Sequence, residues 1–190
     1  AAFVVPLPEV FSHYLQGGRV DVGFLGAAQV DRFGNLNTTV IGPSDKPVTP
    51  LPGAGGAPEI VAHARQTFVM LKASPRSLVP QLDFRTSAGF LDGNGARQRS
   101  TARGGGPRAV ITDFGVLTPH PQTDELQLSA LFEGATVEEA RAAVGWPLAL
   151  AERVDVIAAP TTAELDTLRA LHARTAQAHG QPVQPPGRVE

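Results

Sequence analysis

The chain has 190 residues, of which 42% are hydrophobic, and these values predict one globular domain with a sizeable core. Its 16 basic residues are balanced by 18 acidic ones, so no basic excess indicates nucleic acid or an anionic membrane as a partner. The absence of cysteine excludes disulfides and thiolate metal sites, and it is typical of a cytoplasmic protein.

The first part of the chain is predicted to contain a helix, a strand and a hairpin. The helix is expected to begin at Leu7 and to end before Gly17-Gly18. Residues 20–26 form a largely apolar run, which is typical of a strand buried on both faces of a mostly parallel sheet. Residues 27–41 then predict a hairpin, because turn-forming residues separate two extended segments.

The middle of the chain is rich in proline and glycine. Four prolines between residues 42 and 52 are expected to preclude regular structure. After them we predict a short helix at 58–64, a buried strand at 67–71 and an extended segment at 78–84. Residues 89–106 contain six glycines and three arginines, which predict an exposed, mobile loop.

The last part of the chain is predicted to complete the sheet and to add two helices. The expected elements are a strand at 107–113, a pairing of 116–117 with 126–132, a helix opened by a Thr136–Glu139 capping box, a strand at 146–150 and a helix at 162–178. One domain is therefore expected over residues 1–180, followed by a Pro-rich tail at 181–190. The chain starts inside an apolar stretch, which predicts that an N-terminal segment is missing.

The glycine-rich stretch at Pro52–Glu59 is the first candidate for a site. Gly53, Gly55 and Gly56 have no Cβ, so neighbouring N–H groups could converge on one anionic oxygen. A helix that begins at Pro58 would add the dipole of its N-terminus. The alternative is a tight connection with no ligand.

Other polar residues offer weaker signals. The five histidines lack metal-ligand spacing, and no Gly-x-Ser-x-Gly motif indicates a serine hydrolase. Asn35 and Asn37 flank the predicted hairpin turn, either as turn formers or as groups that reach the glycine turn. Glu59 fits a favourable first-turn helix charge better than a nucleophile. Four arginines could hold phosphates or could keep a solvated loop soluble: Arg97, Arg99, Arg103 and Arg108.

Five ordered blocks of sequence resemble the β subunit of family I CoA-transferases. These blocks are Gly17–Asp31, Gly34–Asn37, Gly53–Ala57, Val110–Asp113 and Gly134–Glu139. The Asn-Thr-Thr-Val-Ile-Gly stretch after the turn is similar to the B subunit of glutaconate CoA-transferase and to the related subunit of steroid-ring-opening CoA hydrolases. It is less similar to acetate or succinyl-3-ketoacid transferases.

The resemblance implies an α/β fold of the CoA-transferase type, with an open, mostly parallel sheet flanked by helices. It implies that the partner is an α subunit, in a heterodimer or an α2β2 heterotetramer, with the active site at the interface. A coenzyme A thioester is the implied substrate, with no permanently bound cofactor and no metal. In such transferases a glutamate attacks the acyl-CoA to give an anhydride and then a glutamyl-CoA thioester, and a second carboxylic acid collects the CoA.

That glutamate usually lies in a Glu-Asn-Gly type motif upstream of the block that starts here at Gly17. The chain has no such motif, so we expect the carboxylate either before Ala1 or on the α subunit. The residues expected to bind the oxyanion and CoA are Gly53, Gly55, Gly56 and Ala57, with Asn35 and Asn37 lining the same pocket. The alternatives are the β subunit of a ring-opening hydrolase, which cleaves a carbon–carbon bond, and a non-catalytic structural subunit.

Overall fold

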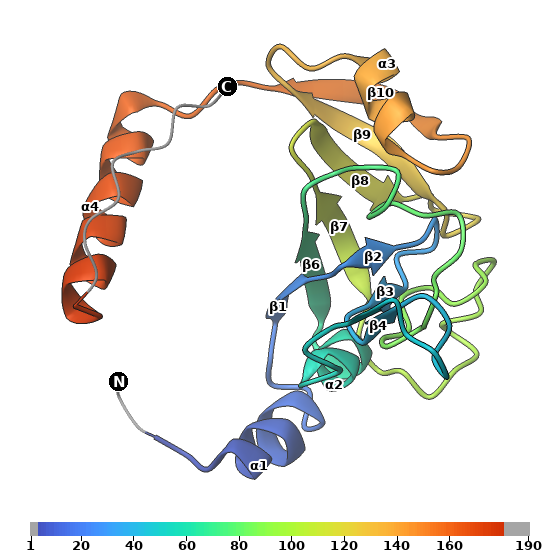
Figure 1. Cartoon of the computed structure of the whole chain (residues 1–190), viewed down its shortest axis with the longest axis vertical. Coiled ribbons are helices and arrows are strands. Elements are labelled where there is room, and N and C mark those ends of the chain that lie inside the picture. Colours follow the sequence, from blue (N-terminus) through green and yellow to red (C-terminus); the bar gives the residue numbers. More distant parts are fainter. Residues whose placement is uncertain (1–3, 181–190) are drawn as a thin grey trace. The chain divides into compact units, whose positions relative to one another are not determined.

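The computed structural model describes residues 4–180, which separate into two compact units with a boundary after Ile157. The first unit contains a six-stranded sheet in the order β1-β6-β7-β8-β9-β10 (Figure 1). The second contains one helix, α4 (Thr162–Ala178), at the predicted position. The predicted domain limits of 1–180 stay a prediction, and the predicted tail at 181–190 lies outside the described residues.

The strands of the sheet follow the predicted order. Their bounds are β1 (Val22–Gly26), β6 (Gln66–Met70), β7 (Pro107–Ile111), β8 (Gly115–Pro119), β9 (Leu126–Phe132) and β10 (Ala149–Ile157). The β1–β6, β6–β7 and β9–β10 pairs are parallel, whereas β8 runs antiparallel to both of its neighbours. The predicted mostly parallel α/β sheet is confirmed. The strand expected at 146–150 is longer and later than predicted, because the chain stays extended to Ile157.

Two short helices cross over one face of the sheet. Helix α2 (Ala57–His63) connects β1 with its parallel neighbour β6 by way of the hairpins, and α3 (Val137–Ala143) connects β9 with β10. Both crossovers run in the same direction along the sheet between strands of the same orientation. Right-handed crossovers therefore place both helices on one face, and Figure 1 shows them there with the β2–β3 hairpin.

The hydrophobic core lies between the sheet and this helical face. Val61 of α2, Val69 of β6, Val110 of β7 and Ala140 of α3 are all fully buried in one cluster. Val30 joins the same cluster from β2 (Gln29–Val30). The side chains on the same face of the sheet thus form a single core, which holds α2 and its preceding turn in place.

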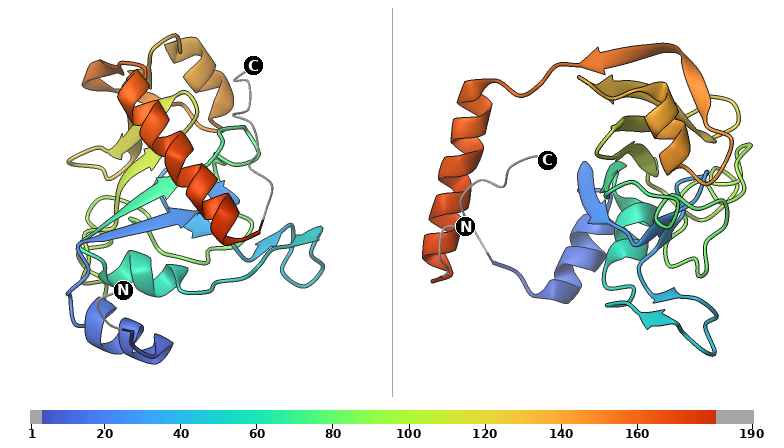
Figure 2. Two further views of the ribbon diagram at one scale, coloured as in Figure 1. Left: turned by 90° about the vertical axis from the view of Figure 1, so that its left-hand side faces the viewer. Right: turned by 45° about the horizontal axis from the view of Figure 1, so that its top comes forward.

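The hairpin region departs from the prediction. β2 pairs with β3 (Leu36–Asn37), as expected, but β4 (Val40–Ile41) pairs with β5 (Thr49–Pro50) inside the proline-rich stretch. The expectation of no regular structure there was wrong at these two residues. An edge strand accommodates Pro50, because a proline lacks only the outward N–H. The second hairpin projects from the body of the unit (Figure 2).

The N-terminal helix is confirmed, and it supports the start of α2. It consists of α1 (Leu7–Glu9) followed by one π-helical segment, η1 (Val10–Leu15). A Cβ on Gly56, the residue before α2, would lie 2.7 Å from the ring of Phe11. Any larger residue at position 56 would therefore separate η1 from α2.

The capping box predicted for α3 is confirmed, and α4 carries a second one. In both helices the threonine oxygen accepts from the N3 backbone N–H, and the N3 glutamate accepts from the threonine N–H. We expect Thr136→Ala to lower the free energy of unfolding of the first unit by about 1 kcal/mol, since α3 packs into its core. Urea denaturation followed by tryptophan fluorescence measures this, because Trp146 lies in the same core. Thr161→Ala, the matched control in α4, should leave that transition unchanged; an equal loss in both variants would contradict the prediction.

Candidate functional site

The glycine turn that precedes α2 has the backbone conformation that the sequence predicts. Gly53 and Gly55 have φ values of +100° and +49°, in the region that favours glycine. A Cβ on either residue would meet nothing within 4 Å, so the turn faces open space. The turn is thus held by backbone conformation rather than by packed side chains.

The structure divides the four predicted site residues into two pairs. The N–H of Gly53 donates to the Thr38 carbonyl, and the N–H of Ala57 donates to the Ala54 carbonyl, both at 3.0 Å. The N–H groups of Gly55 and Gly56 make no hydrogen bond within residues 4–180. Gly55 and Gly56 therefore provide the free donors, whereas Gly53 and Ala57 fix the shape of the turn.

A cavity of about 410 Å³ lies beside this turn. One wall comes from α2 and the other from residues 86–102; the lining residues are Pro58, Glu59, Ala62, His63, Thr86, Ala88, Leu91, Ser100, Thr101 and Ala102. The hydroxyl of Thr86 accepts from the Thr38 N–H at 2.9 Å, and Thr38 in turn holds Gly53. The cavity and the glycine turn are therefore parts of one hydrogen-bonded assembly.

Glu59 is the carboxylate on α2 next to the turn. Its Oε2 accepts from the Gln16 amide at 3.2 Å and lies 3.2 Å from Nε2 of His63. These contacts anchor the first turn of α2 to the residues that follow η1. They agree with the predicted role of Glu59 as a helix charge, and they leave the attacking carboxylate to be found elsewhere.

Asn35 and Asn37 are both buried, and their amide groups bind the chain itself. Asn35 donates to Asp31 and to the Leu91 carbonyl, each at 2.8 Å, and accepts from the N–H groups of Gly89 and Leu91. Its amide thus fixes the segment that carries Leu91 into the cavity wall.

Asn37 donates to Gln29 and to the Val40 carbonyl, and accepts from the Thr39 and Val40 N–H groups. Neither asparagine lines the cavity beside the glycine turn. The structure therefore assigns both residues to holding the loops around the cavity, and a direct contact with a ligand stays a prediction.

Arg97 is the main residue whose role the sequence did not indicate. The exposed loop predicted at 89–106 is wrong for this side chain, which is only 3% exposed. Its guanidinium donates to four carbonyl oxygens, those of Val61, Ala88, Gly89 and Gly104, at 2.6–3.0 Å. Burial lowers the pKa of Arg97 from its ordinary value. Because its donors are occupied by the chain, Arg97 joins the two cavity walls and does not hold a phosphate.

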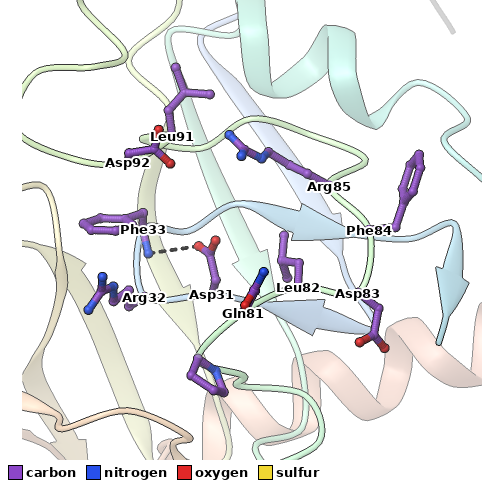
Figure 3. Close-up of a pocket in the computed structure, with 11 residues that line it drawn as sticks. Asp31, Arg32, Phe33, Gln81, Leu82, Asp83, Phe84, Arg85, Leu91 and Asp92 are labelled. Carbon is purple, nitrogen blue, oxygen red and sulfur yellow. Dashed lines mark hydrogen bonds between the residues drawn. The ribbon is translucent and has the colours of Figure 1, made fainter. Parts of the chain in front are cut away.

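A second cavity, of about 460 Å³, lies on the other side of Leu91 (Figure 3). Leu91 has a φ of +59° and lines both cavities. In the second cavity, Arg85, Asp92 and the buried carboxylate of Asp31 point toward the same space. Asp31 Oδ1 accepts from the Phe33 N–H at 2.9 Å and from the Asn35 N–H at 3.0 Å.

Burial raises the pKa of Asp31 above its ordinary value, and this outweighs the hydrogen bonds and the Arg85 charge, which lower it. A carboxyl whose pKa is raised by folding stabilises the protein below its unfolded pKa, and that contribution is lost as the pH rises through the folded pKa. We therefore expect the unfolding free energy of the wild type, relative to Asp31→Asn, to increase from pH 7 to about pH 4. Urea titrations across this range measure it; a constant difference, or one that decreases toward acid, would contradict the assignment.

Two further kinds of site are absent from residues 4–180. No cluster of three or more His, Cys, Asp or Glu side chains there is arranged to bind a metal ion. None of the helices in that range combines the length and hydropathy that a membrane span requires.

Comparison with known proteins identifies the family. A family model described as coenzyme A transferase matches residues 8–143. The chain belongs to this family. It is 52% identical over 178 residues to the B subunit of 3-oxoadipate CoA-transferase from Pseudomonas knackmussii, covering 94% of this chain and 68% of that relative. It is 32% identical over 159 residues to the B subunit of glutaconate CoA-transferase from Acidaminococcus fermentans, covering 83% and 59%.

Solved structures give the same result for the fold. Glutaconate coenzyme A-transferase from A. fermentans superimposes with a TM-score of 0.80 at 30% identity, over 88% of this chain and 65% of that one. The decarboxylase AibA/AibB matches with a TM-score of 0.71 at 28% identity, over 87% and 62%. The predicted family, the fold and the resemblance to β subunits, which the relatives' names call B, are confirmed. The chain spans roughly two thirds of these relatives.

Proposed function

We propose that this chain acts in the β subunit of a two-subunit CoA-transferase that moves coenzyme A between an acyl-CoA and a dicarboxylic acid. The 52% identity to the B subunit of 3-oxoadipate CoA-transferase, over 94% of the chain, carries this proposal. Both named substrates, 3-oxoadipate and glutaconate, are dicarboxylates. An α subunit is the partner that the relatives' names imply.

The glycine turn supplies the oxyanion site in this proposal. When a carboxylate attacks a thioester, negative charge develops on the carbonyl oxygen, and two preorganised N–H donors stabilise it. Gly55 and Gly56 are the donors with free N–H groups, and they lie beside the cavity that would receive the acyl end. The cavity has both apolar and hydroxyl-bearing walls, which suits a thioester arm of mixed polarity.

The attacking group is a glutamate in the proposed reaction, and it lies on the α subunit or on a part of the β subunit outside the residues of this chain. It forms a mixed anhydride as the thiolate leaves, and the thiolate then attacks the glutamyl carbonyl to give the glutamyl-CoA thioester. The free dicarboxylate attacks this thioester and takes the CoA. Trapping with hydroxylamine or borohydride during turnover, followed by mass spectrometry, locates the modified glutamate.

Reconstitution tests the function as a whole. We expect this chain, mixed with the α subunit of the P. knackmussii enzyme and an acyl-CoA donor, to form 3-oxoadipyl-CoA or glutaconyl-CoA only when the acid is present. Mass spectrometry of the CoA products measures this. Free acid released from the donor without an acceptor would instead favour a hydrolase, and no turnover with labelled or unlabelled donors would favour a structural subunit.

A further inference from the structure

One face of the parallel half of the sheet carries apolar side chains that no element of the first unit covers. β1 pairs with β6 so that Phe24 lies beside Phe68, with ring centroids 5.7 Å apart. β6 pairs with β7 so that Met70 lies beside Ile111. We call this surface the open face; it consists of Val22, Phe24, Phe68, Met70 and Ile111.

The direction of the side chains places the open face opposite the helices. A Cβ on Gly23 would lie 2.4 Å from Ile60 of α2, so Gly23 points toward the helical face. Because side chains alternate along a strand, Phe24 points the other way. Phe24 is 63% exposed and Met70 is 48% exposed, whereas Leu25, on the helical side, packs against the core.

The topology explains why the described elements leave this face bare. The right-handed crossovers through α2 and α3 cover the same face, as Figure 1 shows. Covering the opposite face requires a crossover in the reverse direction, which begins from the β1 edge. Among the described residues of the first unit, no helix makes such a crossover.

The chemistry of the strands indicates that a cover exists. Parallel sheets are found almost only with both faces covered, and their strands are then apolar on both sides. β1 has this composition, with Val22 and Phe24 on one side and Leu25 on the other. A stacked, exposed aromatic pair on a flat sheet surface is otherwise a site of association or aggregation.

We propose that the open face is the docking surface for a helical segment of the β subunit, the part by which the relatives exceed this chain. About a third of the P. knackmussii relative lies outside the matched region, and 41% of the A. fermentans relative does so. A segment of this size can form a helical layer on a three-strand face and a further strand beyond β1. This inference rests on the family and the sheet, and it stands independently of the proposed reaction.

A chimera tests the proposal. The unmatched residues of the P. knackmussii relative are joined in one polypeptide to this chain, and both proteins are compared as wild type and as Phe24→Lys. We expect this chain alone to enhance the fluorescence of the apolar dye ANS several-fold, with Phe24→Lys and the chimera each removing most of the enhancement. We further expect Phe24→Lys to lower the urea midpoint of the chimera but to leave that of this chain alone unchanged.

Val48→Lys is the matched control, because Val48 is 76% exposed on the loop between β4 and β5, away from the open face. It should change neither the dye signal nor either midpoint. The same midpoint shift from Phe24→Lys in both proteins would overturn the proposal. So would a weak dye signal in this chain alone, a Phe24-dependent dimer in sedimentation, or loss of the dye signal only when the α subunit is added; the last two results would assign the face to a second copy or to the α subunit.

Discussion

Replacing Arg97 by methionine is expected to lower the free energy of unfolding by on the order of 3–5 kcal/mol. The side chain is almost completely buried, and it donates to the carbonyls of Val61, Ala88, Gly89 and Gly104. Methionine fills a similar volume but offers no donor, so these oxygens would be left buried without partners. Urea denaturation of the wild type and the variant measures the loss.

Arg99→Met is the matched control for this prediction. Arg99 lies two residues away and is exposed, and its one hydrogen bond is to the Asn94 carbonyl. Its replacement should change stability by no more than about 0.5 kcal/mol. Arg97→Lys separates charge from geometry: it keeps the cation but cannot reproduce the planar fork, so it should recover only part of the loss. Equal stabilities of the Arg97→Met and Arg99→Met variants would show that Arg97 is not the residue that joins the cavity walls.

The contrast between these two arginines shows what could not be predicted from the sequence. Both lie in a glycine-rich stretch with little apolar content, which is typical of an exposed loop. The difference arises from partners that are distant in the chain, since Val61 lies 36 residues before Arg97. Local composition carries no record of such pairs. The same holds for Asn35, whose amide binds residues 54 and 56 positions away.

Features that depend on local rules were predictable. The glycine turn, the two-residue pairing of β2 with β3 and the capping box at Thr136 each follow from side-chain types within a few residues. β1 illustrates the intermediate case: its apolar run predicted burial on both faces, yet Phe24 is exposed. The composition of a strand reports the surroundings for which it is suited, and those surroundings can include chain outside residues 4–180.

Replacing Gly55 by valine is expected to reduce acyl-CoA turnover of the reconstituted two-subunit enzyme by roughly 10²–10³-fold, a loss of about 3–4 kcal/mol of transition-state stabilisation. Position 55 has a φ of +49°, which a β-branched residue adopts only with strain. The new side chain would meet nothing within 4 Å at its Cβ, so the variant should fold. The strain is relieved by rotating the turn, and this rotation aims the N–H groups of Gly55 and Gly56 away from the oxyanion.

Gly134→Val separates this effect from general backbone strain. Gly134 has a φ of +90°, and its Cβ position is equally open, but it lies in the turn before α3 rather than beside the cavity. Both variants should lose about 1–2 kcal/mol of stability in urea, while only Gly55→Val should lose turnover. The loss should appear in kcat and kcat/KM together, because the donors act on charge that exists only in the transition state. Equal turnover by the two variants would remove the oxyanion role from the glycine turn and leave it a tight connection.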